Sequence, residues 1–216
     1  MNKRVLVVLF LLSFVFANAQ IVKPFVGGGV YIHSDFEKTG FLSLRSGAEF
    51  NVSKYIKPEI EISGLLGSLE SSSKLDANNV MIAEISRSVS AVNFSFCPKI
   101  ILGNELVSYF EILPKYSIST IEAHKNSYSY NNTTGNLTSG KYEIAKEWSQ
   151  SFGIGIGYSF NFSDEYSDSM SLILDLQNVD LGKPLNKLSP NANRVDTKWT
   201  FGLGLNYYFN FKSKKV

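Results

Sequence analysis

The stretch Trp199–Phe211, WTFGLGLNYYFNF, decides the fold. Every second residue from Trp199 is aromatic or leucine, and the residues between them are almost all small or polar. The first set is Trp199, Phe201, Leu203, Leu205, Tyr207, Phe209 and Phe211; the second is Thr200, Gly202, Gly204, Asn206, Tyr208 and Asn210. Successive side chains of a β-strand point to opposite faces. This period of two therefore predicts a strand with one apolar face and one polar face.

Seven more segments follow the same design, whereas helical periodicity is nearly absent. The expected strands cover residues 25–33, 42–52, 59–66, 92–102, 110–119, 152–162 and 171–177. Three consecutive glycines, Gly27 to Gly29, leave the facing of the first one open. With the C-terminal stretch, the sequence predicts eight strands.

The charged residues of these strands fall on one register. In seven of the strands no Asp, Glu, Lys or Arg occupies the apolar register, while the companion register holds Arg45, Glu49, Glu59, Glu61, Lys99, Glu111, Lys115 and Asp175. Eight strands close around an interior that side chains can just fill. Because buried charges persist only when they are paired, we predict a structural polar network inside a barrel.

The connections alternate in length. Those near residues 53–57, 103–106 and 163–168 are short, those near 69–87, 123–147 and 179–198 are long and polar, and only 35–40 is brief on the long side. Short turns at one end and long loops at the other are typical of outer-membrane barrels, whose short turns are periplasmic. The prediction is an all-β, eight-stranded, antiparallel, transmembrane up-and-down barrel with a plugged polar interior and no open pore. The alternative is a soluble lipocalin-like ligand-binding barrel with the apolar register inside.

The N-terminus has the order of a secretory signal. Lys3 and Arg4 precede an apolar run over 5–16, and Ala17-Asn18-Ala19 follows. This order predicts a signal peptide at 1–19, cleaved before Gln20, and a barrel domain at 20–216. Without Lys3 and Arg4 the chain has 19 basic and 19 acidic residues, and this neutrality argues against nucleic acid as a partner.

Several segments together resemble a known class of proteins. They are the cleavage region ANAQ, the connection NVSKYIKPEIEIS (51–63), the strand GIGIGYSFNF (153–162) and the closing FGLGLNYYFNF (201–211). With them the chain resembles eight-stranded outer-membrane barrels of the OmpA/OmpX type, and more closely the PorT-like outer-membrane β-barrel domain proteins of Bacteroidetes. Such barrels commonly end on an aromatic residue, whereas residues 212–216 follow Phe211 here.

Catalytic and metal-binding patterns are sparse, so we predict no enzyme, no cofactor and no metal. The two histidines, His33 and His124, are expected to be solvated loop residues. His33-Ser34-Asp35 has the residue types of a hydrolase triad, but consecutive strand residues point to opposite faces. A lipid-modifying outer-membrane enzyme that uses His124 and Ser127 is the alternative.

The segment 124–141 is expected to be a loop that contains Tyr128 and Tyr130 among small polar residues. Exposed tyrosines in such surroundings suit recognition, and a merely solvated loop is the competing interpretation. The sequence predicts a monomer in the outer membrane of a Gram-negative cell. Its expected partners are outer-membrane lipid and lipopolysaccharide, with the barrel assembly machinery during biogenesis.

Overall fold

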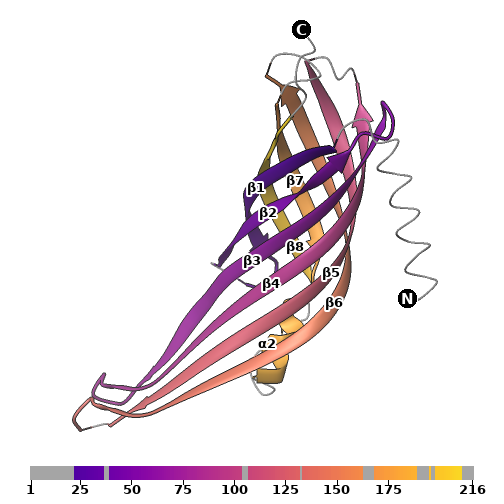
Figure 1. Ribbon diagram of the computed structural model, residues 1–216. Coiled ribbons are helices and arrows are strands. Elements are labelled where there is room, and N and C mark those ends of the chain that lie inside the picture. Colours follow the sequence, from indigo (N-terminus) through magenta and orange to yellow (C-terminus); the bar gives the residue numbers. More distant parts are fainter. Residues whose placement is uncertain are drawn as a thin grey trace, which may run out of the picture.

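A computed structural model describes residues 22–36, 39–103, 107–131, 133–162, 168–188, 195 and 198–210. The predicted signal peptide and the residues after Asn210 lie outside these ranges. Each strand pairs with the next one antiparallel, and β8 pairs with β1, so the strands close into a barrel (Figure 1). The elements are β1 Val22–His33, β2 Gly40–Phe50, β3 Ile56–Leu75, β4 Met81–Leu102, β5 Ser108–Tyr130, β6 Leu137–Asn161, β7 Ser169–Asn178, α2 Gly182–Leu188 and β8 Trp199–Tyr208. The predicted eight-stranded antiparallel barrel is confirmed.

The register around the barrel shows how strongly the strands are tilted. From Val30, the pairings through β2, β3, β4 and β5 reach Lys146 on β6. The pairings through β8 and β7 reach Ile156, ten residues further along the same strand. A stagger of this size, at about 3.3 Å per residue and about 4.8 Å between strands, corresponds to a tilt of about 40°. The barrel is therefore narrow, and side chains can fill its interior.

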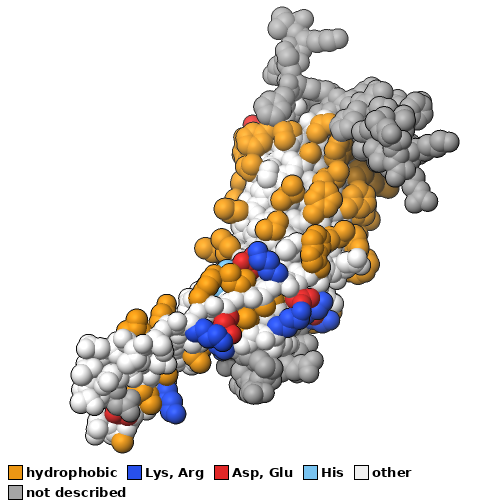
Figure 2. Space-filling view, turned by 60° about the horizontal axis from the view of Figure 1, so that its bottom comes forward, with side chains coloured by type: hydrophobic (Ala, Val, Ile, Leu, Met, Phe, Trp, Pro, Cys, Tyr) orange, Lys and Arg blue, Asp and Glu red, His pale blue; other side chains and the backbone are white. Residues whose placement is uncertain are grey.

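The apolar register faces outward around the whole barrel. Leu44 on β2 is 75% exposed, Phe152 on β6 is 71% exposed and Leu174 on β7 is 64% exposed. The companion residues of the same strands, such as Arg45 and Asp175, are buried. Figure 2 shows apolar side chains spread over the barrel wall. The soluble alternative needs these residues inside, so the structure contradicts it.

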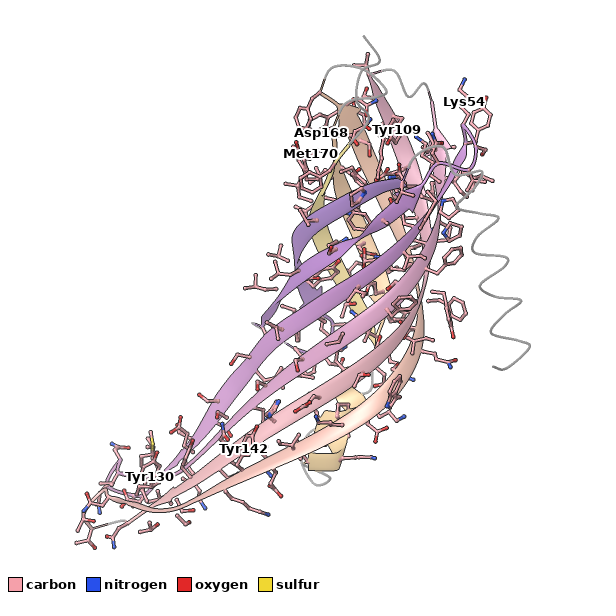
Figure 3. All side chains as sticks on the ribbon, in the orientation of Figure 1. Lys54, Tyr109, Tyr130, Tyr142, Asp168 and Met170 are labelled. Carbon is pink, nitrogen blue, oxygen red and sulfur yellow. The ribbon has the colours of Figure 1, made fainter. Side chains whose placement is uncertain are left out.

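Two of the three predicted long loops are strands. Residues 69–87 and 123–147 were expected to be loops, but most of them continue β3, β4, β5 and β6 beyond the barrel rim. These four strands form a single sheet that projects from the barrel, here called the extension (Figure 1). Figure 3 places Tyr142 partway along the extension and Tyr130 near its tip. The third predicted loop contains the short helix α2.

The interior changes character along the barrel axis. Toward the extension, its inward-facing residues become apolar and form one buried cluster with the segment between β7 and β8. The cluster contains Tyr31, Phe41, Leu65, Leu69, Val89, Ala91, Ile121, Ala123, Val179, Leu181 and Leu185. Leu181 and Leu185 bring α2 onto this layer, because both are almost fully buried there. The other end of the interior holds the charged residues.

The start of β1, the end of β8 and the turn between β2 and β3 lie at the barrel end opposite the extension (Figure 1). Figure 3 places Lys54, Tyr109 and Asp168 at this end. Asp168 ties the start of β7 to the end of β8, because it accepts hydrogen bonds from the Tyr207 hydroxyl (2.6 Å) and the Asn210 backbone N–H (2.7 Å). Among the described residues, no helix is long and apolar enough to cross a membrane.

Candidate functional site

All eight charged residues predicted for the interior are buried inside the barrel, at 6% exposure or less. The first group surrounds Lys99, whose side chain is fully buried. Its Nζ lies 2.6 Å from Glu49, 2.9 Å from Glu59 and 3.1 Å from Glu111. Lys99 Nζ also lies 4.3 Å from the centre of the Tyr208 ring, and the Tyr208 hydroxyl donates to Glu59. One lysine therefore holds three carboxylates from three strands together.

The second group joins Lys115, Glu61, Asp175 and Arg45. Lys115 Nζ lies 3.3 Å from Glu61 and 3.4 Å from Asp175, and Arg45 Nη1 lies 4.0 Å from Asp175. Tyr31 connects the members, because its hydroxyl accepts from Arg45 and donates to Asp175 at 2.9 Å. Since the partners come from β1, β2, β3, β5 and β7, the contacts bridge the barrel interior.

Lys23 and Lys57 also lie in the interior, although the sequence did not predict them there. Both are buried, at 6% and 5% exposure, and Lys57 Nζ lies 5.9 Å from the centre of the Tyr109 ring. With them the described interior holds five cations (Lys23, Arg45, Lys57, Lys99 and Lys115) and five carboxylates (Glu49, Glu59, Glu61, Glu111 and Asp175). The interior is thus formally neutral. Lys23 and Lys57 have odd residue numbers, as do the inward-facing Phe25 of β1 and Glu59 of β3. Alternation along each strand could therefore have placed both lysines inside.

Glycines on the inner register make room for the large polar side chains. A Cβ at Gly202 would overlap the Tyr31 ring, and one at Gly204 would lie 2.6 Å from Arg45. A Cβ at Gly157 would lie 2.5 Å from Glu111. These glycines therefore leave room for bulky interior neighbours.

Helix α2 is fastened to β6 at the rim of the barrel. Lys183 lies 3.0 Å from Glu147, and Lys187 pairs with the same carboxylate. These two lysines hold the pKa of Glu147 below its ordinary value, because they donate hydrogen bonds to the ionised form. Lys125 Nζ donates to the Leu188 carbonyl at 3.2 Å, so β5 also holds the end of the helix.

Neither histidine is a solvated loop residue, so that prediction is wrong. His33 ends β1 at 4% exposure, and its Nδ1 accepts from the Asp35 backbone N–H at 3.1 Å. His124 lies on β5, where its side chain is only 27% exposed. His124 and Ser127 differ by an odd number of positions on an unbroken strand, so their side chains leave opposite faces of the sheet. This pair cannot converge on a substrate.

Tyr128 and Tyr130, predicted in a loop, lie on β5 in the extension. The ring of Tyr128 lies over Gly140 of β6, where a Cβ would be 3.4 Å away. The Tyr130 hydroxyl donates to Glu84 of β4 at 3.3 Å. Both tyrosines therefore belong to the outer face of the extension, which is the face continuous with the outer wall of the barrel.

The same face carries a cluster closer to the barrel. His124 stacks on Tyr142 with ring centres 5.7 Å apart, and its Nδ1 is hydrogen-bonded to the Tyr142 hydroxyl. His124 Nε2 lies 3.3 Å from Glu122, and Lys146 Nζ lies 2.7 Å from the other oxygen of that carboxylate. In the part of the chain that the structure describes, no three His, Cys, Asp or Glu side chains are arranged to hold a metal ion.

Comparisons with known proteins show similarity of fold only. No protein-family model matches the sequence, and no curated protein matches it. Among solved structures, Ail, the attachment invasion locus protein of Yersinia pestis, is 12% identical with a TM-score of 0.45, over 87% of this chain and 97% of that one. Neisserial surface protein A is 9% identical with a TM-score of 0.45, over 88% and 96%. A major outer membrane protein from Thermus thermophilus is 14% identical with a TM-score of 0.44, over 88% and 100%.

Proposed function

We propose that the chain is a transmembrane barrel of a Gram-negative outer membrane with a non-enzymatic structural or binding role. The proposal rests on a distribution of apolar and charged side chains opposite to that of a soluble protein. Large apolar side chains cover the outside of the barrel, while ten charged residues are buried inside it. In water this arrangement would expose apolar surface and bury charge, and both are unfavourable. In lipid the same wall is solvated by acyl chains, and closure pairs every strand edge within the barrel.

The packing of side chains in the interior supports the proposal that the barrel is plugged and is not an open pore. Two layers fill it in succession: the ion-paired layer around Lys99 and Lys115, and the apolar cluster that includes Leu181 and Leu185 of the segment carrying α2. An aqueous channel needs a continuous polar path, and the apolar layer interrupts it. The PorT-like relationship, the cleaved signal at 1–19 and the monomeric state belong to the same proposal.

Fractionation and gel mobility test the membrane location. The full chain, produced in a Gram-negative host, should appear in the outer-membrane fraction and migrate faster on a gel unless it is boiled. Recovery in the soluble periplasm, without heat-dependent migration, would refute the proposal.

Planar bilayers test the plug. Purified folded protein should give no steady ion conductance at voltages where a porin of known conductance, added as a positive control, conducts. Steady channels from protein that still migrates as a folded barrel would refute the plugged interior while leaving the membrane location intact.

The lipid-modifying enzyme is the second class, and it makes a distinct prediction. His124 is engaged by Glu122 and Tyr142 and faces away from Ser127, so His124→Ala should leave the lipid composition of cells that overproduce the protein unchanged. A change in lipid species that depends on His124 would overturn the non-enzymatic role.

A further inference from the structure

The outer face of the extension exposes large apolar and aromatic side chains. We define this face by the even-numbered residues of β5 from Glu122 to Tyr130 and of β6 from Thr138 to Trp148. Trp148 is 70% exposed, Tyr142 58% and Ile144 46%. A merely solvated sheet would have polar residues at such positions. Exposed aromatic residues grouped on one face instead indicate a contact surface.

This face continues the lipid-facing wall of the barrel without a break. The pairing of β5 with β6 keeps one register from Ser108 to Ser129, so Trp148 and Tyr142 share the face of Phe152 and Ile154. Phe152 is 71% exposed and belongs to the apolar belt. From Trp148 to Gly140 the strand rises by about 26 Å, at about 3.3 Å per residue. A molecule lying along β6 would thus contact the belt at one end and the aromatic face at the other.

Lysines gather where the apolar belt ends. Lys146, Lys183 and Lys187 lie around Trp148, with side chains 64%, 47% and 63% exposed. Lys183 Nζ lies 3.4 Å from the Trp148 carbonyl oxygen, which fixes this lysine at that level. Lys146 pairs with Glu122 on this outer face. Lys183 and Lys187 share Glu147, an odd-numbered residue on the opposite face of β6, so they add one excess positive charge at the edge of β6 that β7 does not cover. Figure 2 shows such paired charges where the barrel wall passes into the extension. This is the level at which an anionic head group would lie.

Beyond the lysines, the face presents aromatic rings next to hydrogen-bonding groups. Tyr142 stacks on His124, and the Tyr128 ring lies beside Gly140 of the neighbouring strand. Glu122 and Glu84 supply carboxylate acceptors beside these rings. Sugar rings present C–H faces, which pack on aromatic rings, and hydroxyls, which donate to carboxylates. The face therefore has the chemistry to bind a chain of sugars.

We propose that the outer face of the extension binds a phosphorylated glycolipid of the outer leaflet. Its acyl chains would lie on the belt near Phe152, a phosphate near Lys146, Lys183 and Lys187, and its sugars along Tyr142, His124 and Tyr128. The inference rests on the proposed membrane location. A lipid is favoured over a protein partner because the aromatic face continues into the apolar wall along β6, and lysines of β6 and α2 lie at the level where that wall ends.

Binding of fluorescent lipopolysaccharide to the folded full chain in detergent micelles tests this assignment. Tyr128→Ala/Tyr142→Ala should weaken binding roughly tenfold, since exposed aromatic anchors carry much of the binding energy of such surfaces. Tyr55→Ala is the matched control, because Tyr55 is 57% exposed but lies in the turn before β3, at the opposite end of the barrel. It should bind like the parent chain. Tyr142→Phe, which keeps the ring, should also retain binding.

Two further arms separate the parts of the ligand. Lys183→Gln/Lys187→Gln should weaken binding to phosphorylated lipopolysaccharide but leave binding to a dephosphorylated form unchanged. Phosphatidylglycerol should compete poorly, because it has no sugar chain. Equal binding by the parent and the tyrosine variants, or equal competition by phosphatidylglycerol, would overturn the inference.

Heat-dependent gel migration of each preparation shows whether a negative result contradicts the glycolipid site or the proposed membrane barrel itself. A folded barrel that does not select lipopolysaccharide would refute the glycolipid site alone. A chain that never shows a folded barrel in micelles or membranes would refute the proposed function.

Discussion

Replacing Lys99 by methionine removes the one cation that three interior carboxylates share. Lys99 Nζ lies 2.6, 2.9 and 3.1 Å from Glu49, Glu59 and Glu111, and all four side chains are 3% exposed or less. Removing one partner of a single buried ion pair destabilises a protein by about 3–5 kcal/mol, because a charge is left buried without compensation. Since three carboxylates lose their cation here, we expect Lys99→Met to cost at least about 4 kcal/mol.

Urea unfolding in lipid vesicles, followed by the fluorescence of Trp148 and Trp199, measures this cost. With slopes of about 1–3 kcal/mol per molar urea, the midpoint should fall by more than about 1 M. Lys141→Met, which breaks an exposed pair with Glu143, should leave the midpoint unchanged. Adding Glu111→Gln to Lys99→Met should restore part of the loss by removing one surplus charge. If Lys99→Met unfolds at the urea concentration of Lys141→Met, the buried network does not hold the barrel together.

Three other substitutions probe the wall and the turns. Gly202→Ala places a Cβ against the Tyr31 ring, too close for a normal contact, and should cost about 1–3 kcal/mol in the same unfolding assay. Gly64→Ala has no atom within 4 Å of its new Cβ and should cost nothing; equal effects would contradict the inward facing of Gly202. Leu44→Arg, at a 75% exposed site of the belt, should cost about 2–4 kcal/mol in a bilayer, whereas Ser86→Arg on the extension should cost little. Asp168→Asn should destabilise the chain at neutral pH, because hydrogen bonds from Tyr207 and Asn210 hold the pKa of Asp168 below its ordinary value. The ionised Asp168 contributes to the free energy of unfolding above the ordinary pKa of an aspartate, and this contribution is lost as the pH falls through the lowered pKa of Asp168. The stabilities of parent and variant should therefore differ at neutral pH and converge in acid.

The barrel wall could be predicted from the sequence because lipid and interior impose opposite demands on alternate residues. Leu172 and Leu174 face out and Asp175 faces in, as their parity predicts. The same rule placed Lys99 and Glu111 together inside. Lys23 and Lys57 follow it too, but they lie at strand ends, where fewer alternating neighbours reveal the register.

The extension could not be predicted in this way. Beyond Thr120 and Trp148 neither face of the sheet lies in the apolar belt, so serines and charged residues occur on both faces and the sequence resembles a loop. The interior also reverses there, since Val89 and Ile121 face inward as members of the apolar cluster. Tyr128 and Tyr130 were singled out by composition, but pairing of β5 with β6 decides their common face. Strand pairing is a long-range property that local sequence does not carry.

Oxygen and nickel-chelate accessibility of spin labels on β7 tests the central claim most directly. Labels attached one at a time at Ser171, Leu172, Ile173 and Leu174, in a Cys97→Ser background and in lipid vesicles, report which side of the wall each residue faces. Residues 172 and 174 should collide readily with lipid-soluble oxygen, and residues 171 and 173 should be shielded from both reagents, because the first pair is 48% and 64% exposed and the second pair is buried. The reverse alternation, or uniform access to the water-soluble nickel chelate, would contradict a barrel with its apolar residues in lipid and its charges inside.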